Sequence, residues 1–95
     1  MKTIIRGRDS GKAKELLEYA QQNDAMIITQ NKRAFKVKAE SLGFKDIEII
    51  DYEDLQYDNY DDNKPVVIHN GDKMLYWLIS QKYGLETIGF TATEV

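Results

Sequence analysis

The chain has 95 residues, with no cysteine, one histidine and one proline. Without cysteine it can form no disulfide, thiolate metal site or cysteine nucleophile. Its single histidine, His69, excludes every site built from two or more histidines. No apolar run approaches the ~18 residues of a membrane-spanning helix, and no basic-then-apolar leader precedes the first apolar stretch. These absences predict a soluble, cytoplasmic protein without a membrane partner.

The charge is small and unevenly distributed. Residues 1–50 carry ten Lys and Arg against seven Asp and Glu, a balance of +3, and residues 51–95 carry three against nine, a balance of −6, so that the net charge is −3. This distribution argues against direct nucleic-acid binding by bulk charge. It leaves room for a local basic patch, for which the candidates are Lys32, Arg33, Lys36 and Lys38.

The apolar residues alternate between strand-like runs and helical periodicity. Hydrophobic residues make up 42% of the chain, which excludes a disordered protein, and the length is that of one domain. The pattern predicts strands at residues 3–5, 25–29, 47–50, 66–68 and 87–90, and helices at residues 13–20, 31–42 and 72–82. Gly43 and Gly84 are expected to end the second and third helices, and Leu75, Leu78 and Ile79 to form the inner face of the third.

Strands that alternate with helices predict a parallel sheet covered on both faces. We therefore expect a single α/β domain over residues 1–95, a three-layer sandwich with about five mostly parallel strands. Residues 51–63 interrupt the pattern with six acids, three tyrosines and no basic residue, and are expected to form a loop.

The segment from Ile4 to Lys14 reads as a strand, a short polar turn with two glycines, and the start of a helix. Backbone N–H groups at such a turn point outward unpaired and, with the helix dipole, favour an anion. Lys12, just inside the helix, adds a charge that can reach a phosphate. The alternative interpretation is a tight turn followed by a solvated lysine.

This segment resembles the phosphate loop of P-loop NTPases, in particular the Gly-Gly-Arg-Gly-Ser-Gly-Lys-Ser/Thr loop of phage-associated ATPases and helicase-like proteins. The matching residues are Gly7, Arg8, Ser10, Gly11 and Lys12. The resemblance implies a P-loop fold, a phage or prophage origin, and weak binding of ATP or phosphate through these five residues. Arg6 and Asp9 replace glycines, and Ala13 replaces the hydroxyl residue that ligates Mg²⁺ in the family.

Two later segments resemble further motifs of that family. Residues 66–70 occupy the place of the second motif, an apolar strand that ends in an aspartate, but His69 stands at the aspartate position and Asn70 follows it. Asp72 is a weaker candidate for reaching a metal, because the helix dipole alone favours an acid there. Thr91-Ala92-Thr93 resembles the third helicase motif. The lost Mg²⁺ contacts imply that hydrolysis is absent or very weak, and we predict no catalytic residue and no metal site.

The acidic, tyrosine-rich segment 51–63 is a candidate for docking on a basic protein, since tyrosines give contact area and carboxylates meet Lys and Arg. The candidate residues are Asp54, Tyr57, Asp58, Tyr60, Asp61 and Asp62. The plainer interpretation is a solvated loop with Leu55 and one tyrosine packed on the core.

Three functions remain open on the sequence. The leading one is a non-catalytic P-loop-like protein that binds a phosphate-containing ligand or a macromolecular partner. The second is an interaction or inhibitor protein that docks on a basic, nucleic-acid-binding partner through residues 51–63. The third is an NTPase completed by groups from a partner chain.

Overall fold

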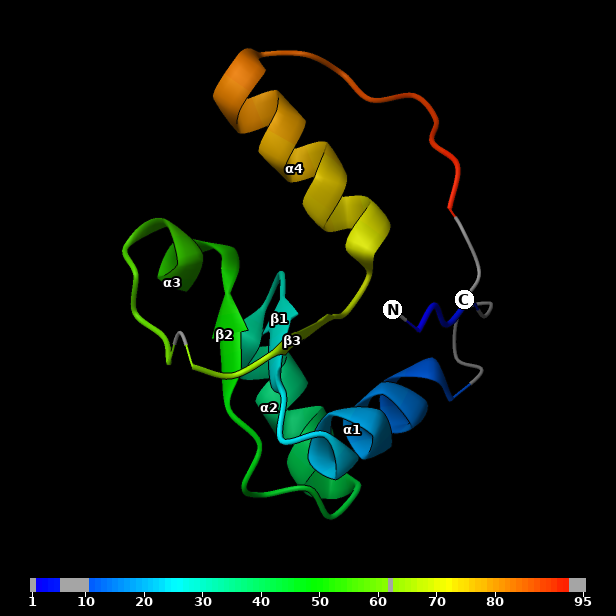
Figure 1. Ribbon diagram of the computed structural model, residues 1–95, viewed down its shortest axis with the longest axis vertical. Helices are drawn as coiled ribbons and strands as arrows, with labels where there is room; N and C mark the ends of the chain where they lie inside the picture. Colours follow the sequence, from blue (N-terminus) through cyan, green and yellow to red (C-terminus); the bar gives the residue numbers. More distant parts are fainter. Residues whose placement is uncertain (1, 6–10, 62, 93–95) are drawn as a thin grey trace.

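The structure, a computed structural model, describes residues 2–5, 11–61 and 63–92. Its centre is a parallel sheet of three strands, β1 (Met26–Thr29), β2 (Ile49–Asp51) and β3 (Val66–Ile68). The strand order is β2-β1-β3, so that β1 lies in the middle (Figure 1). Ile27 is in register with Ile49 on one side and with Val67 on the other.

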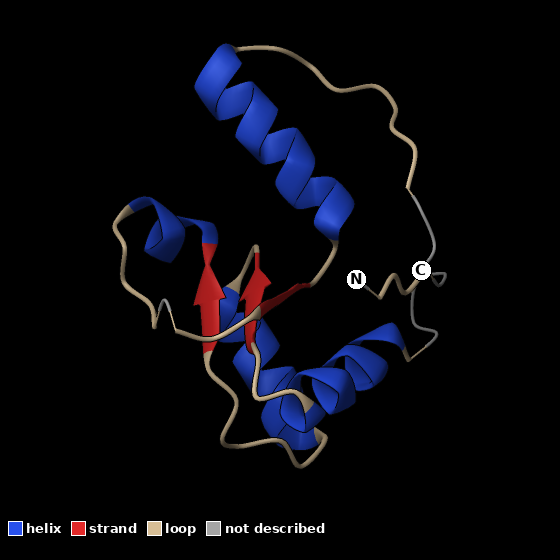
Figure 2. Ribbon diagram, viewed as in Figure 1, coloured by secondary structure: helices blue, strands red, loops and turns tan. Residues whose placement is uncertain are grey.

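Helices pack against both faces of this sheet (Figure 2). One face is covered by α1 (Lys12–Gln22) and α2 (Lys32–Ser41), which bury Leu17 and Phe35 against Ile27. The other face is covered in part by α3 (Tyr52–Gln56) and α4 (Gly71–Tyr83), and Val66 and Ile68 of β3 stay exposed there. There Tyr52 is buried with the strand residues Met26, Ile28 and Ile50, and the α4 residues Met74 and Trp77 pack against that cluster. Because neighbouring strand residues point to opposite faces, β1 contributes to both cores.

Polar capping residues and glycines determine where the helices begin and end. The Asn31 side chain accepts a hydrogen bond from the Ala34 N–H at 3.0 Å and so caps α2. Gly84 ends α4 with φ at +66°, and Gly43 follows α2 with φ at +89°. This left-handed backbone is the conformation for which glycine is the favoured residue. The predicted roles of both glycines are confirmed.

Replacing Asn31 with alanine is expected to lower the free energy of unfolding by about 1 kcal/mol, because the first turn of α2 loses its side-chain acceptor. Asn31→Ser should recover most of the loss, because serine is also a good N-cap residue. Urea denaturation of the three proteins measures the effect. Equal losses for alanine and serine would contradict a capping role for Asn31.

The predicted α/β class, the parallel strands and the helices on both faces are confirmed, but the prediction of five strands is wrong. Residues 3–5 and 87–90 form no strand, and Ile5 and Ile88 are 72% and 92% exposed. A three- or four-residue apolar run becomes a strand only where a neighbouring strand completes its hydrogen bonds. The sequence pattern shows that such a run is apolar, but it does not show whether a neighbouring strand is present.

Two details on the α3–α4 side of the sheet also differ from the prediction. Residues 52–56, expected in a loop, form α3, because Asp51 and Asp54 build a reciprocal capping box at its start. In α4 the residues that pack inward are Met74 and Trp77, while Leu75 and Leu78 are exposed. A helix that is apolar around most of its circumference gives periodicity no basis for choosing the inner face.

Within the described ranges, no helix combines the length and the apolar character that crossing a membrane requires.

Candidate functional site

The topology of the sheet marks one place for a ligand. The chain passes from β1 through α2 to β2 on one side of β1, and then returns to the other side to form β3. Ligands of open α/β sheets bind beyond the carboxyl ends of the strands where the strand order reverses in this way. Here that place lies between Thr29, the last residue of β1, and His69, which directly follows β3.

His69 is held at this position from three directions. Its backbone N–H donates to the carbonyl of Ile28 at 2.9 Å. Its Nδ1 lies 3.1 Å from the hydroxyl of Thr29, which is itself buried. Its ring lies 4.6 Å, centroid to centroid, from the ring of Phe35 in α2. The imidazole is therefore fixed at the carboxyl ends of β1 and β3.

The electrostatics around His69 are positive. Burial, together with the charges of Lys12, Lys38 and Lys73, lowers the pKa of His69 to about 4, while Asp72 opposes them. The three lysines come from α1, α2 and α4. In a chain with a net charge of −3, three cations from different helices therefore lie near enough to His69 to affect its pKa.

The glycine loop is described only from Gly11 onward. Gly11 is the N-cap residue of α1 with φ at +83°, and it provides no side chain to cap the first turn. Lys12 is half-buried and lies close enough to His69 to affect its pKa. The structure thus brings together Lys12 of the first motif and His69 of the second, 57 positions apart along the chain. Gly7, Arg8 and Ser10, the other predicted phosphate-binding residues, lie outside the described residues.

The residues present do not fit a P-loop magnesium site. Ala13 has no ligating oxygen and is buried among Leu17, Ile27 and their neighbours. The His69 ring nitrogen is engaged with Thr29. Asp72 is exposed in the first turn of α4, and the described ranges contain no group of three or more His, Asp or Glu side chains placed to hold a metal ion.

No family model, curated protein or solved structure matches the chain. The likeness to P-loop NTPases therefore stays a prediction from the motifs. The function of the site is therefore inferred from the chemistry of its own residues.

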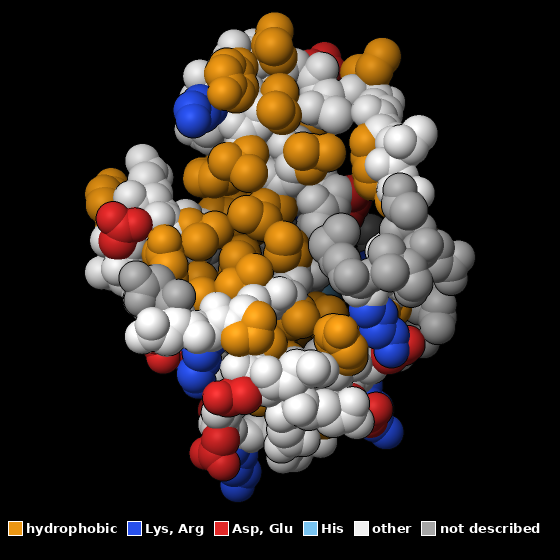
Figure 3. Space-filling model, in the orientation of Figure 1, with side chains coloured by type: hydrophobic (Ala, Val, Ile, Leu, Met, Phe, Trp, Pro, Cys, Tyr) orange, Lys and Arg blue, Asp and Glu red, His pale blue; other side chains and the backbone are white. Residues whose placement is uncertain are grey.

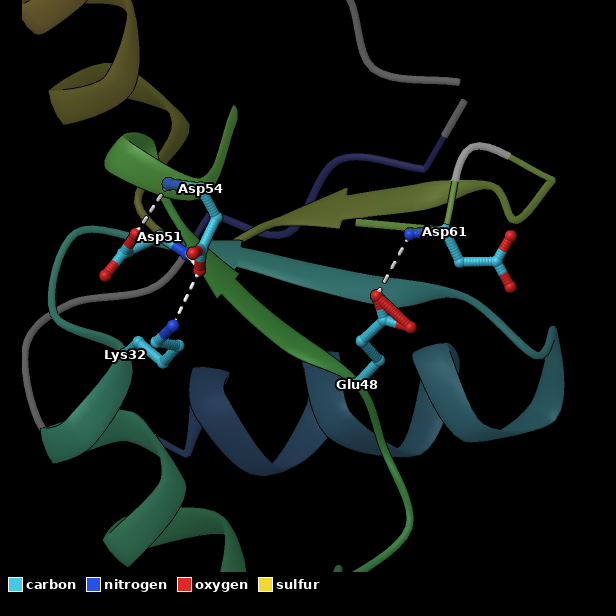
Figure 4. Close-up of polar contacts among 5 residues, drawn as sticks. All are labelled: Lys32, Glu48, Asp51, Asp54 and Asp61. Atoms are coloured by element: carbon cyan, nitrogen blue, oxygen red, sulfur yellow. Dashed lines mark hydrogen bonds and ion pairs between the residues drawn. The ribbon is translucent and has the colours of Figure 1, made fainter. Parts of the chain in front are cut away.

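A second polar feature lies on the other side of β1. An open hollow of about 570 Å³ is lined by Gln30, Asn31, Lys32, Arg33 and Asp51. Beside it, Lys32 donates to Asp54 Oδ2 at 2.8 Å, and the same oxygen accepts the Asp51 N–H at 3.1 Å (Figure 4). The hydrogen bond from Lys32 holds the pKa of the Asp54 carboxyl below its usual value. Lys32, one of the four candidates for a basic patch, is therefore paired within the chain.

The acidic segment is only partly available to a partner. Asp51 and Asp54 cap α3, and Tyr52 is buried against Trp77 with ring centroids 5.0 Å apart. The Asp61 N–H donates to Glu48 Oε2 at 3.3 Å (Figure 4). Among the predicted docking residues Tyr57 and Asp58 are exposed, Asp54, Tyr60 and Asp61 are partly buried, and Asp62 lies outside the described residues. The internal contacts account for much of the unusual composition, and docking on a basic protein stays a prediction.

Three residues near His69 were not predicted as site residues: Thr29, Phe35 and Lys73. Lys38 was predicted only as a member of a candidate basic patch. Thr29 could have been identified from the sequence, because it is the polar residue at the end of a buried strand. Lys73 could not have been identified in this way, because lysines on the surface of helices are common. The approach of Lys38 and Lys73 to His69 depends on how α2 and α4 pack.

Proposed function

We propose that the protein binds a phosphate-bearing ligand at the carboxyl edge of the sheet, between β1 and β3, and does not hydrolyse it. The observation that carries the proposal is the position of Lys12, Lys38 and Lys73, near enough to His69 for their charges to lower its pKa against the effect of Asp72. A local excess of positive charge, here three lysines against Asp72, raises the local concentration of anionic ligands.

The start of α1 supports phosphate in particular. The first N–H groups of a helix have no partner within the helix, and the helix dipole favours negative charge there. Gly11 leaves that end without a side-chain cap, and Lys12 stands beside it. The resemblance to the P-loop extends the proposed contact set to Gly7, Arg8 and Ser10, with Asn70 at the opposite strand end.

The absence of hydrolysis follows from the same residues. Phosphoryl transfer in P-loop proteins relies on a divalent cation held by a hydroxyl and an aspartate. At those two positions the chain has Ala13, buried in the core, and His69, engaged with Thr29. Binding without turnover is the chemistry that the remaining groups support.

A thermal-shift titration of Lys12→Ala tests the proposal. ATP or inorganic phosphate should raise the melting temperature of the wild type, because a ligand that binds only the folded state stabilises it by about 2.7 kcal/mol at a hundredfold excess over Kd. Lys12→Ala should lose the shift. Lys14→Ala is the matched control, since Lys14 is exposed on the same helix and should keep it.

Two results would count against this function. A shift that Lys12→Ala and Lys14→Ala reduce equally would indicate general charge screening. Metal-dependent turnover of ATP by the purified protein would contradict the non-catalytic part. Turnover that appears only after a second protein is added would favour an NTPase completed by a partner.

A further inference from the structure

Helix α4 has two apolar faces, and the sheet covers only one of them. Met74 and Trp77 pack against the buried cluster around Tyr52. Leu75, Ile79 and Tyr83 recur at four-residue intervals, a spacing that places them along one side of a helix, away from Met74 and Trp77. Leu75 and Tyr83 are exposed, and Ile79 is partly buried. None of the 13 residues of α4 is buried. A helix that is apolar on both sides is normally covered on both.

The apolar surface around α4 is large for a chain of this size. Its exposed members are Leu75, Tyr76, Leu78, Tyr83, Leu85, Val66 and Ile68, with exposures between 37% and 61%. Val66 and Ile68 are in register with Met26 and Ile28 and so lie on the sheet face that α4 packs on. At roughly 200 Å² for a large side chain, the five residues of α4 and its C-terminal end expose roughly 500 Å². Figure 3 shows hydrophobic side chains gathered along α4 and over the neighbouring sheet. This area is at the upper end of the 300–600 Å² of the largest patch on a typical monomer and below the about 800 Å² per partner of a standard interface, so that a contact made through it would be weak.

The charges on α4 indicate which partner fits. Asp72 lies in the first turn and Lys82 in the last. When two copies of α4 run antiparallel and are both centred on residue 77, Asp72 of each copy lies opposite Lys82 of the other. The same register places Leu75 opposite Ile79. A parallel arrangement would instead bring like charges together.

We propose that α4 is the contact between two copies of this chain, which pair antiparallel about a two-fold axis through the middle of the helix. In this arrangement opposite charges and apolar residues of the two copies face each other, as a self-complementary two-fold contact requires. A lipid surface fits less well, because helices that lie on membranes carry many Lys and Arg on their polar face. The basic residues of α4 are Lys73 and Lys82.

The mass of the protein in solution tests the proposal directly. Sedimentation equilibrium between about 10 μM and 1 mM, the range suited to a modest interface, should show the wild type approaching twice its 11.0 kDa. Ile79→Glu should keep it monomeric, since glutamate preserves helix propensity while placing a charge in the contact. The matched control is Val37→Glu, which changes an exposed apolar residue of α2 and should still dimerise.

Cross-linking tests the register. Because the chain has no cysteine, the double variant Leu75→Cys, Ile79→Cys carries the only thiols, and mild oxidation should give a disulfide-linked dimer. Val37→Cys should give far less at the same concentration. A wild type that stays monomeric up to 1 mM would overturn the proposal. So would a dimer that Ile79→Glu leaves intact, or binding of the wild type to anionic vesicles in place of self-association.

Discussion

Replacing Leu17 with alanine is expected to lower the free energy of unfolding by about 2–5 kcal/mol. The Leu17 side chain is completely buried and packs with Ile27 of β1 and Phe35 of α2, so that it joins α1 to the sheet. Truncation removes apolar contacts and leaves a cavity that the neighbours fill only in part. A loss of this size is a large share of the about 5–15 kcal/mol typical of a domain.

Thermal and urea denaturation measure this effect, and each kcal/mol should lower the melting temperature by about 4–8 °C in a domain of this length. Val37→Ala is the control, because Val37 is 65% exposed on α2 and its truncation should change stability by no more than about 0.5 kcal/mol. If the two variants were equally stable, α1 would not be packed on the sheet as described.

The parts of the fold that could be predicted are those where local pattern and packing agree. The apolar run at residues 25–29 contains β1, and the helical periodicity of residues 13–20 falls within α1. In both places the residues that form the pattern are also buried, including Leu17 and Ile27. Local sequence was sufficient there because the buried side is defined by the pattern itself.

The errors arose where the outcome depends on partners far along the chain. Residues 3–5 and 87–90 have the composition of strands, but pairing requires an edge to join. α4 is apolar on both sides, so only the packed sheet decides that Trp77 faces inward and Leu75 does not. α3 was missed for a different reason. Its capping box uses Asp51 and Asp54, and in a run of six acids these two could not be distinguished from the rest.

Two residues of the candidate site could be named from the sequence, but not their proximity in the fold. Lys12 and His69 were both singled out from their positions after a strand or before a helix. Their proximity follows from the reversal of strand order at β1, which a single sequence does not display. The contributions of Lys38 and Lys73 depend on helix packing in the same way.

The pH dependence of stability should reveal the environment of His69. Its pKa is lowered from 6.5 to about 4 in the folded state, mainly by burial and then by Lys12. Between these two values the unfolded chain binds a proton that the folded chain does not, so that stability is complete above about pH 6.5 and declines as the pH falls towards 4. Each unit of pKa difference corresponds to about 1.36 kcal/mol. Because His69 is only half-buried, screening by solvent reduces the total to about 1–2 kcal/mol.

Carboxyl groups also titrate at the lower end of this range, so the measured quantity is the difference between the wild type and His69→Asn. Asparagine keeps a polar atom near Thr29 but does not titrate, and its stability should fall less steeply between pH 6.5 and 4. NMR provides a second measurement, because the ring protons of the single histidine can be assigned without ambiguity. Saturating phosphate should raise the pKa of His69, since an anion at the site stabilises the imidazolium. Titration of His69 near 6.5 in the free protein, with the same acid slope in both proteins, would mean that His69 is neither buried nor close to the three lysines, and the phosphate site would lose its electrostatic basis.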